Sequence, residues 1–162
     1  MLKSLTRKYF STIKGDIKYL HCNATINFKD AKNIVQTMDN NATFDHIHSV
    51  DPIEGSIQSV SFCKLRTLQY HLKKENVYSH INKITIDMKS EFDVRHFFGT
   101  IEGPVKFNFL DYVLNVELDK SNPIKVSEEE FKKIIHKSAN KCPMYIMIMN
   151  NGIPGKADIN LI

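Results

Sequence analysis

The sequence predicts a single α+β domain, in which short strands precede and follow two amphipathic helices. The chain has 162 residues, a typical length for one domain. Hydrophobic residues make up 42% of it and charged residues 25%, as in ordinary globular proteins. Strand-type and helix-type patterns occupy separate stretches of the sequence. Their order is three strands, a long helix, two strands, a helix and a strand.

The first half is predicted to contain three strands and a long helix. Residues 17–26 and 33–38 have strand-type composition, and residues 43–48 alternate between apolar and polar side chains. The helix is expected to begin at Pro52, with Asp51 as its N-cap. Apolar residues then recur at nearly helical spacing at Ile57, Val60, Leu65, Leu68 and Leu72.

The second half is predicted to contain three more strands and a second helix. Ser127 followed by Glu130 forms a capping box, so a helix is expected to start there and to run toward Pro143, where the proline breaks or kinks it. The apolar stretch at residues 144–149 is expected to pack in the core. The strands are expected at residues 84–88, 105–118 and 157–162.

The formal net charge of +4 comes from the first 15 residues. These hold Lys3, Arg7, Lys8 and Lys14 and no acidic residue, and the rest of the chain has 18 basic and 18 acidic residues. A neutral domain gives no reason to expect nucleic acid as a partner, because phosphate binding needs clustered basic side chains. No apolar run approaches the roughly 20 residues of a membrane span, so none is expected.

Residues 1–15 have the composition of a mitochondrial transit peptide. The segment is basic and rich in Ser and Thr, and on a helix Leu2, Leu5 and Tyr9 fall near one side. We therefore expect a targeting segment at residues 1–15, a single domain at residues 16–162 and a location in the mitochondrial matrix. The alternative is a frayed basic N-terminus on a cytoplasmic protein.

Three cysteines are present, Cys22, Cys63 and Cys142. The odd number argues against a disulfide framework, and the absence of a Cys-x-x-Cys motif leaves no zinc ribbon or thioredoxin-type site. Cys63 falls on or beside the apolar face of the first helix, and Cys142 closes the second. From the pattern alone, Cys63 and Cys142 are each best interpreted as ordinary buried thiols.

Two motifs resemble the OsmC/Ohr family, the osmotically inducible protein C and organic hydroperoxide resistance proteins. The first is the Asp-Pro-Ile-Glu start of the long helix, in which Glu54 lies nine residues before Cys63. The second is Cys142-Pro143 at the end of the second helix. The order of strands and helices matches the family over residues 16–162. The resemblance implies a mainly antiparallel sheet wrapped around a long central helix that carries Cys63, in an intertwined homodimer.

The resemblance also implies a function, a thiol-dependent peroxidase that reduces organic hydroperoxides. In that family the helix cysteine, here Cys63, is the nucleophile, and the Cys-Pro cysteine, here Cys142, resolves it to a disulfide. An external dithiol reductant then resets the site. Glu54 is the candidate supporting carboxylate, and no cofactor or metal is implied.

Two departures from the family pattern place the chain nearer an uncharacterised branch. The best-studied peroxidases carry Glu directly after the helix-starting proline, where this chain has Ile53, and they use an arginine that is missing here between Arg7 and Arg66. The alternative function is therefore an OsmC-like protein without efficient peroxidase activity, which binds a small apolar ligand or serves another thiol role. Other residues that offer positive charge are Lys18, His21, Lys29 and Lys32.

Two further features of the sequence have simpler interpretations. His46 and His48 share one face of a predicted strand, but no third ligand has convincing spacing, so a solvent-facing or dimer-facing pair is favoured over a metal site. Lys132, Lys133 and Lys137 are expected to form a solvated helix face.

Overall fold

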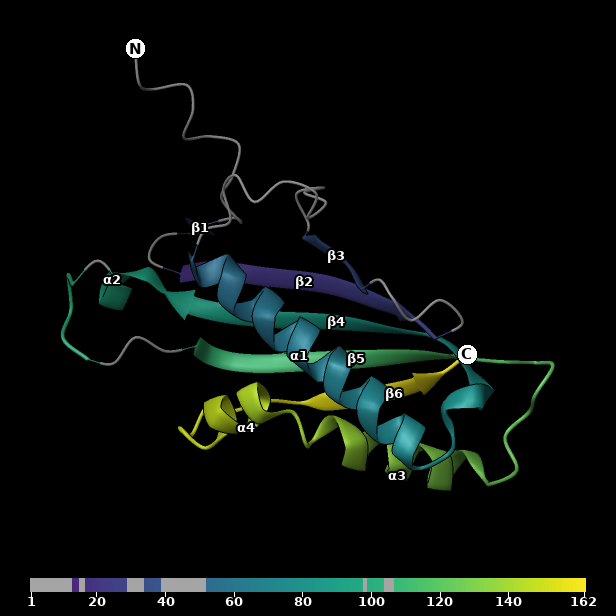
Figure 1. Ribbon diagram of the computed structural model, residues 1–162. Coiled ribbons are helices and arrows are strands. Elements are labelled where there is room, and N and C mark those ends of the chain that lie inside the picture. The colour runs from purple at the N-terminus through teal and green to yellow at the C-terminus, as the bar shows by residue number, and fades with distance from the viewer. Residues whose placement is uncertain (1–12, 15–16, 29–33, 39–51, 98, 104–106) are drawn as a thin grey trace, which may run out of the picture.

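The computed structural model describes residues 13–14, 17–28, 34–38, 52–97, 99–103 and 107–162 (Figure 1). It confirms the predicted α+β class, with one mixed sheet and the helices packed on it. The predicted strand at residues 43–48, which includes His46 and His48, lies outside the described residues, as does Asp51.

The sheet is mainly antiparallel, as predicted. Its order is β1-β2-β4-β5-β6, and β3 also pairs with β2. All neighbours are antiparallel except β5 and β6, which are parallel. The strands are β1 (Ile13–Lys14), β2 (Ile17–Asn27), β3 (Ile34–Met38), β4 (Ile81–Asp93), β5 (Phe107–Leu118) and β6 (Ala157–Leu161).

The helices begin where the sequence predicts. The long helix α1 (Pro52–Lys74) starts at Pro52. The Ser127 hydroxyl accepts a hydrogen bond from the Glu130 N–H at 3.2 Å, which caps the start of α3 (Glu128–Ala139). Shorter helical segments are η1 (Tyr78–His80), α2 (Val94–Phe97) and α4 (Pro143–Met149). No helix in the described part of the chain has both the length and the apolarity to cross a bilayer.

The core lies between one face of the sheet and α1, which runs across the sheet in Figure 1. Alternate residues of β2, β4 and β5 are buried, and Cys22, Met88 and Tyr112 are register partners across these strands. Because side chains alternate between the two faces of a strand, these three lie on the same face. α1 contacts β2 and β4 on one side and α3 and α4 on the other. The centre of α1 therefore buries the side chains that face the sheet, α3 and α4, and leaves Ser59, Phe62 and Tyr70 exposed on its remaining face.

The chain from residue 140 onward differs from the prediction. The second helix stops at Ala139, and Pro143 begins a separate helix, α4. The prediction that residues 144–149 pack in the core is confirmed for Tyr145, Ile148 and Met149, which are buried in or packed against it, and is wrong for Met144, Ile146 and Met147. Met147 is 67% exposed and Ile146 39%, and within α4 only Tyr145 is buried. The reason is the geometry of a short helix, which turns most of its side chains away from a single contact face.

Candidate redox site

Cys63 and Cys142 lie side by side, although 79 residues separate them in the sequence. The Cys142 thiol donates to the Sγ atom of Cys63 at 3.3 Å. Cys142 is fully buried, whereas Cys63 is half-buried at the edge of the core. A disulfide has an S–S distance of about 2.05 Å, so a small side-chain movement is enough to join the two sulfurs.

The break between α3 and α4 places Cys142 against α1. After Ala139 the chain turns through three residues, and the Cys142 N–H bonds to the Ala139 carbonyl oxygen at 3.3 Å. Pro143 then starts α4, as the fixed φ of proline favours. The Cys-Pro pair thus lies at the junction of two helices, and its cysteine faces the middle of a third.

Lys64, the residue after Cys63, is fully buried beside this pair. Its Nζ atom donates to the Ala139 carbonyl oxygen at 3.1 Å. The same atom lies 3.6 Å from the centre of the Tyr145 ring and 4.1 Å from the centre of the Tyr112 ring. The two rings meet edge to face, with their centres 5.4 Å apart. An ammonium group is thus held between two aromatic faces and a helix-end carbonyl.

The electrostatics of the lysine and the cysteines are linked. Burial lowers the pKa of Lys64 from 10.5 to about 7, against the opposing attraction of Cys142 and then Cys63. Burial also raises the pKa of Cys142 to about 11; the backbone N–H of Tyr145 opposes this shift, Cys63 adds to it, and Lys64 opposes it with the smallest effect. In the described residues, no carboxylate is paired with Lys64 at salt-bridge distance. Among the described side chains, the two thiols are the groups whose negative charge would favour the ammonium.

The third cysteine lies elsewhere. Cys22 is fully buried on β2, and burial raises its pKa to about 11, with the Ser61 hydroxyl opposing the shift. Ser61 and Cys63 are two positions apart on α1, and so point about 200° apart around the helix. Cys22 therefore belongs to the sheet side of α1 and takes no part in the sulfur pair.

The other candidate residues do not join the pair in the described structure. The side chains of Glu54 and Lys18 lie outside the described residues, as do Lys29 and Lys32 entirely. His21 bonds to Asp87 at 2.7 Å on the face of the sheet opposite the core. No group of three metal-ligating side chains occurs among the residues that the structure describes.

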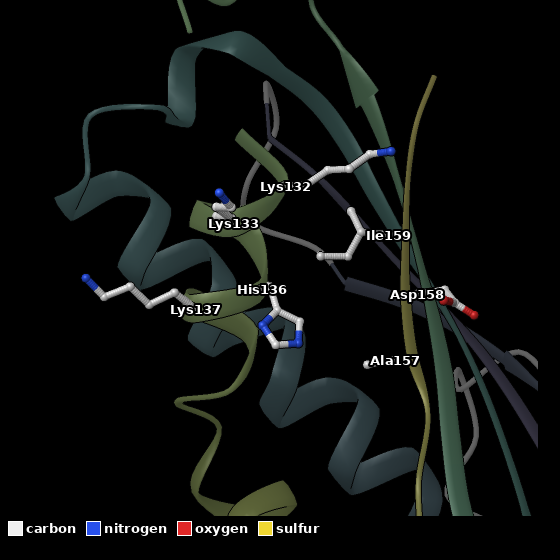
Figure 2. A pocket seen from close by; sticks show the side chains of 7 residues that line it. All are labelled: Lys132, Lys133, His136, Lys137, Ala157, Asp158 and Ile159. Carbon is white, nitrogen blue, oxygen red and sulfur yellow. The ribbon is translucent and has the colours of Figure 1, made fainter. Parts of the chain in front are cut away.

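A surface hollow lies between α3 and β6, away from the cysteines. It has a volume of about 320 Å³. Figure 2 shows that the lysines at its rim, Lys132, Lys133 and Lys137, point in different directions, and that Asp158 points to the other side of β6. Lys133 and Lys137 are exposed, as predicted for a solvated helix face. Ammonium groups that diverge in this way do not enclose an anion, and the sulfur pair remains the candidate site.

Sequence reasoning missed Lys64, although the signal was present. Val60, Lys64 and Leu68 are spaced by four, so the lysine occupies the apolar stripe of α1 that its neighbours define. A lysine in such a stripe is rarely buried without a partner. Its position directly after a candidate nucleophile was a second indication. What the sequence does not show is the pair of tyrosines, which come from β5 and α4.

The α+β fold and the paired thiols, one on α1 and one between α3 and α4, define a protein with a candidate redox site. Residues 44–157 match the family model described as OsmC-like protein, and the chain belongs to this family. The expected family resemblance is thereby confirmed. A search of the curated proteins finds no match.

Solved structures agree with this fold. An OsmC-like protein from Mycoplasma pneumoniae matches with a TM-score of 0.54 and 14% identity, over 93% of this chain and 98% of that chain. A hypothetical protein from Aquifex aeolicus matches with a TM-score of 0.51 and 15% identity, over 80% and 86% of the two chains. Such distant identities show the shared fold alone, and they fit membership of a distant branch.

Proposed function

We propose that this OsmC family protein is a thiol-dependent peroxidase that reduces organic hydroperoxides through Cys63 and Cys142. The observation that carries the proposal is the 3.3 Å contact between the two sulfurs. Half-buried Cys63 is open to a substrate, and fully buried Cys142 stands behind it. This is the arrangement that a nucleophile and a resolving thiol require.

In the first step, the Cys63 thiolate attacks the terminal oxygen of the hydroperoxide. The S–O bond forms as the O–O bond breaks, so Cys63 is oxidised to a sulfenic acid and the peroxide is reduced to an alkoxide. The alkoxide takes a proton and leaves as the alcohol. The thiolate is the reactive form in this step, because a thiol is a far weaker nucleophile.

In the second step, the Cys142 thiolate attacks the sulfur of the Cys63 sulfenic acid. The S–S bond forms as the S–O bond breaks, and hydroxide leaves and is protonated to water. An external dithiol then reduces the disulfide by thiol–disulfide exchange and is itself oxidised. No cofactor enters this cycle.

Exposed apolar side chains flank both cysteines. Phe62, next to Cys63, is 43% exposed, and Met144, two residues after Cys142, is 37% exposed. We propose that such surface packs against a second copy of the chain in a homodimer and favours alkyl over polar peroxides. Light scattering tests the dimer, and a monomeric mass in solution contradicts it.

The activity is tested by following cumene hydroperoxide consumption with dihydrolipoamide or dithiothreitol as reductant. Wild type and Cys22→Ser are expected to consume the peroxide, and Cys63→Ser is expected to match the background without protein. Cys22→Ser is the matched control, because it makes the same change at a thiol outside the pair. Equal rates for wild type and Cys63→Ser contradict the peroxidase. They leave the alternative, an OsmC-like protein that binds a small apolar ligand or serves another thiol role.

A further inference from the structure

Lys64 touches the chain on both sides of Cys142. Its Nζ atom bonds to the carbonyl oxygen of Ala139, three residues before Cys142, and this oxygen also accepts the Cys142 N–H. On the other side it lies 3.6 Å from the ring centre of Tyr145, three residues after Cys142. The ammonium is thus fixed against the two segments that hold this cysteine in place.

The arrangement around the ammonium leaves it little freedom to move. Tyr112 on β5 and Tyr145 on α4 cover it, and Tyr112 in turn donates from its hydroxyl to the Asn140 Oδ1 atom at 3.4 Å. A buried cation needs either hydrogen bonds or aromatic faces to replace water, and this one has both. What the described surroundings lack is a carboxylate paired with it.

We infer that Lys64 is a positioning residue for the resolving step, whose ammonium stabilises Cys142 as the thiolate that attacks the oxidised Cys63. The inference rests on the proposed two-cysteine cycle. In that cycle Cys142 needs such help more than Cys63 does, because it is the fully buried thiol.

The charges of the groups that face Lys64 fit this role. From α1 and from the turn before α4 these are Cys63 and Cys142, which both favour the ammonium, with Cys142 the stronger. From β5 and α4 they are Tyr112 and Tyr145, whose pKa values burial raises, so both stay neutral near pH 7. From α3 the facing group is the Ala139 carbonyl at the helix C-terminus, where a cation is favoured. The resolving thiolate is thus the partner that would complete the charge balance.

The test separates the two chemical steps in the full chain. One equivalent of cumene hydroperoxide is mixed with reduced protein, and the reaction is quenched at intervals with dimedone, which traps sulfenic acid, or with a thiol alkylating agent. Mass spectrometry then gives the amounts of Cys63 sulfenic acid and of disulfide over time. The variants are Lys64→Met, which keeps a long unbranched side chain, and Lys73→Met, which makes the same change at an exposed position of α1.

Lys64→Met is expected to form the sulfenic acid at close to the wild-type rate and to form the disulfide roughly 3- to 10-fold more slowly. Each pKa unit that Cys142 gains lowers its thiolate fraction about tenfold, while the more basic thiolate is a somewhat better nucleophile. Lys73→Met is expected to behave as wild type. Lys64→Arg, which keeps the charge, is expected to lose less of the disulfide rate than Lys64→Met.

The pH profile distinguishes a charge effect from a packing effect. Lys64 has a pKa of about 7, so its charge is present below that pH and is lost above it. The ratio of wild-type to Lys64→Met disulfide rates is therefore expected to be largest below pH 7 and to approach one at higher pH. A ratio that does not change with pH overturns the inference, as does an equal disulfide rate in folded Lys64→Met.

A second pair of variants tests the same inference if Lys64→Met does not fold. Tyr145→Leu removes one aromatic face, and Tyr145→Phe keeps the ring. The leucine variant is expected to slow disulfide formation selectively, and equal rates in the two variants overturn the inference. If the wild type itself forms no Cys63 sulfenic acid, the proposed peroxidase has failed, which is a separate outcome.

Discussion

Cys22 and Cys142 are both fully buried against α1, and burial raises the pKa of each to about 11. They differ in what surrounds the sulfur. Cys22, on the sheet side of the helix, has the Ser61 hydroxyl, and Asp87 raises its pKa further. Cys142, on the side of α3 and α4, has a second sulfur at 3.3 Å and a cation beside it. Burial alone makes a thiol inert. The neighbouring sulfur and the cation are therefore what distinguish Cys142, in a candidate redox site, from Cys22, a core residue.

The largest effect is expected from replacing Cys63, the proposed nucleophile of the sulfur pair. Cys63→Ser is expected to lower peroxide consumption by roughly 100-fold or more, because the replacement hydroxyl is a far weaker nucleophile than a thiolate. Cys22→Ser, on the other side of α1, is expected to keep the wild-type rate. The measurement is steady-state loss of cumene hydroperoxide. Loss of activity in both variants would contradict the assignment of the activity to Cys63 and not to Cys22.

The next effect separates the two members of the pair. Cys142→Ser is expected to react once with peroxide and then to be oxidised further to the sulfinic acid at Cys63 when peroxide is in excess, since no neighbouring thiol traps the sulfenic acid. Mass spectrometry after titration with peroxide measures the added oxygen atoms. If Cys63 in this variant stays as free of overoxidation as in the wild type, Cys142 is not the resolving thiol.

The buried Lys64 is expected to make the stability of the folded protein depend on pH. Because its pKa falls from 10.5 in the unfolded chain to about 7 in the folded one, the unfolded state binds more protons between these values. Stability is therefore expected to rise with pH above 7, by at most about 1.4 kcal/mol per pH unit. This rise in stability ends near pH 9, because Cys22 and Cys142 begin to lose protons there in the unfolded chain, which lowers the stability as the pH increases.

Lys64→Met is expected to remove this slope. The measurement is the free energy of unfolding in urea at pH 7, 8 and 9 for wild type, Lys64→Met and Lys73→Met, with the cysteines kept reduced. The control lysine is exposed and is expected to leave the slope unchanged. Identical slopes in all three proteins would mean that Lys64 titrates as an ordinary lysine.

The smallest effect is expected from shortening Cys22, on the side of α1 that faces the sheet. Cys22→Ala leaves a small cavity in a fully packed layer and is expected to cost about 1 kcal/mol of stability. Peroxide consumption is expected to stay unchanged, because the cavity opens toward Ser61 rather than toward Cys63. Urea unfolding and the peroxide assay on the same preparation measure both. A fall in activity larger than the fall in folded protein would connect Cys22 to the site.

Most of the fold was predictable from local patterns. Pro52 and the Ser127 capping box mark helix starts, and both were located correctly because each depends on a few adjacent residues. The second helix ends three residues before the predicted Cys142, at Ala139, where Asn140 takes the C-cap position. The exposure of Met144, Ile146 and Met147 is not predictable from composition, because the apolar segment that holds them resembles a core segment.

The site was predictable in part. The resemblance selected Cys63 and Cys142, and the structure brings them together. Among the described residues the cation beside the pair is Lys64, whereas His21 bonds to Asp87 on the other face of the sheet. The sequence does not show the burial of Lys64, because that depends on tyrosines from β5 and α4. Contacts between residues so far apart in the sequence follow from the packing of the layers, which no local pattern contains.

The most direct test of the redox pair is to map the disulfide after one equivalent of cumene hydroperoxide. The reduced protein is treated without added reductant, free thiols are blocked, and the intact mass and tryptic peptides are measured. The account predicts the loss of two hydrogens, a single cross-link between Cys63 and Cys142, and Cys22 recovered as a blocked thiol. A cross-link through Cys22, or recovery of all three cysteines as free thiols after the peroxide has been consumed, would contradict it.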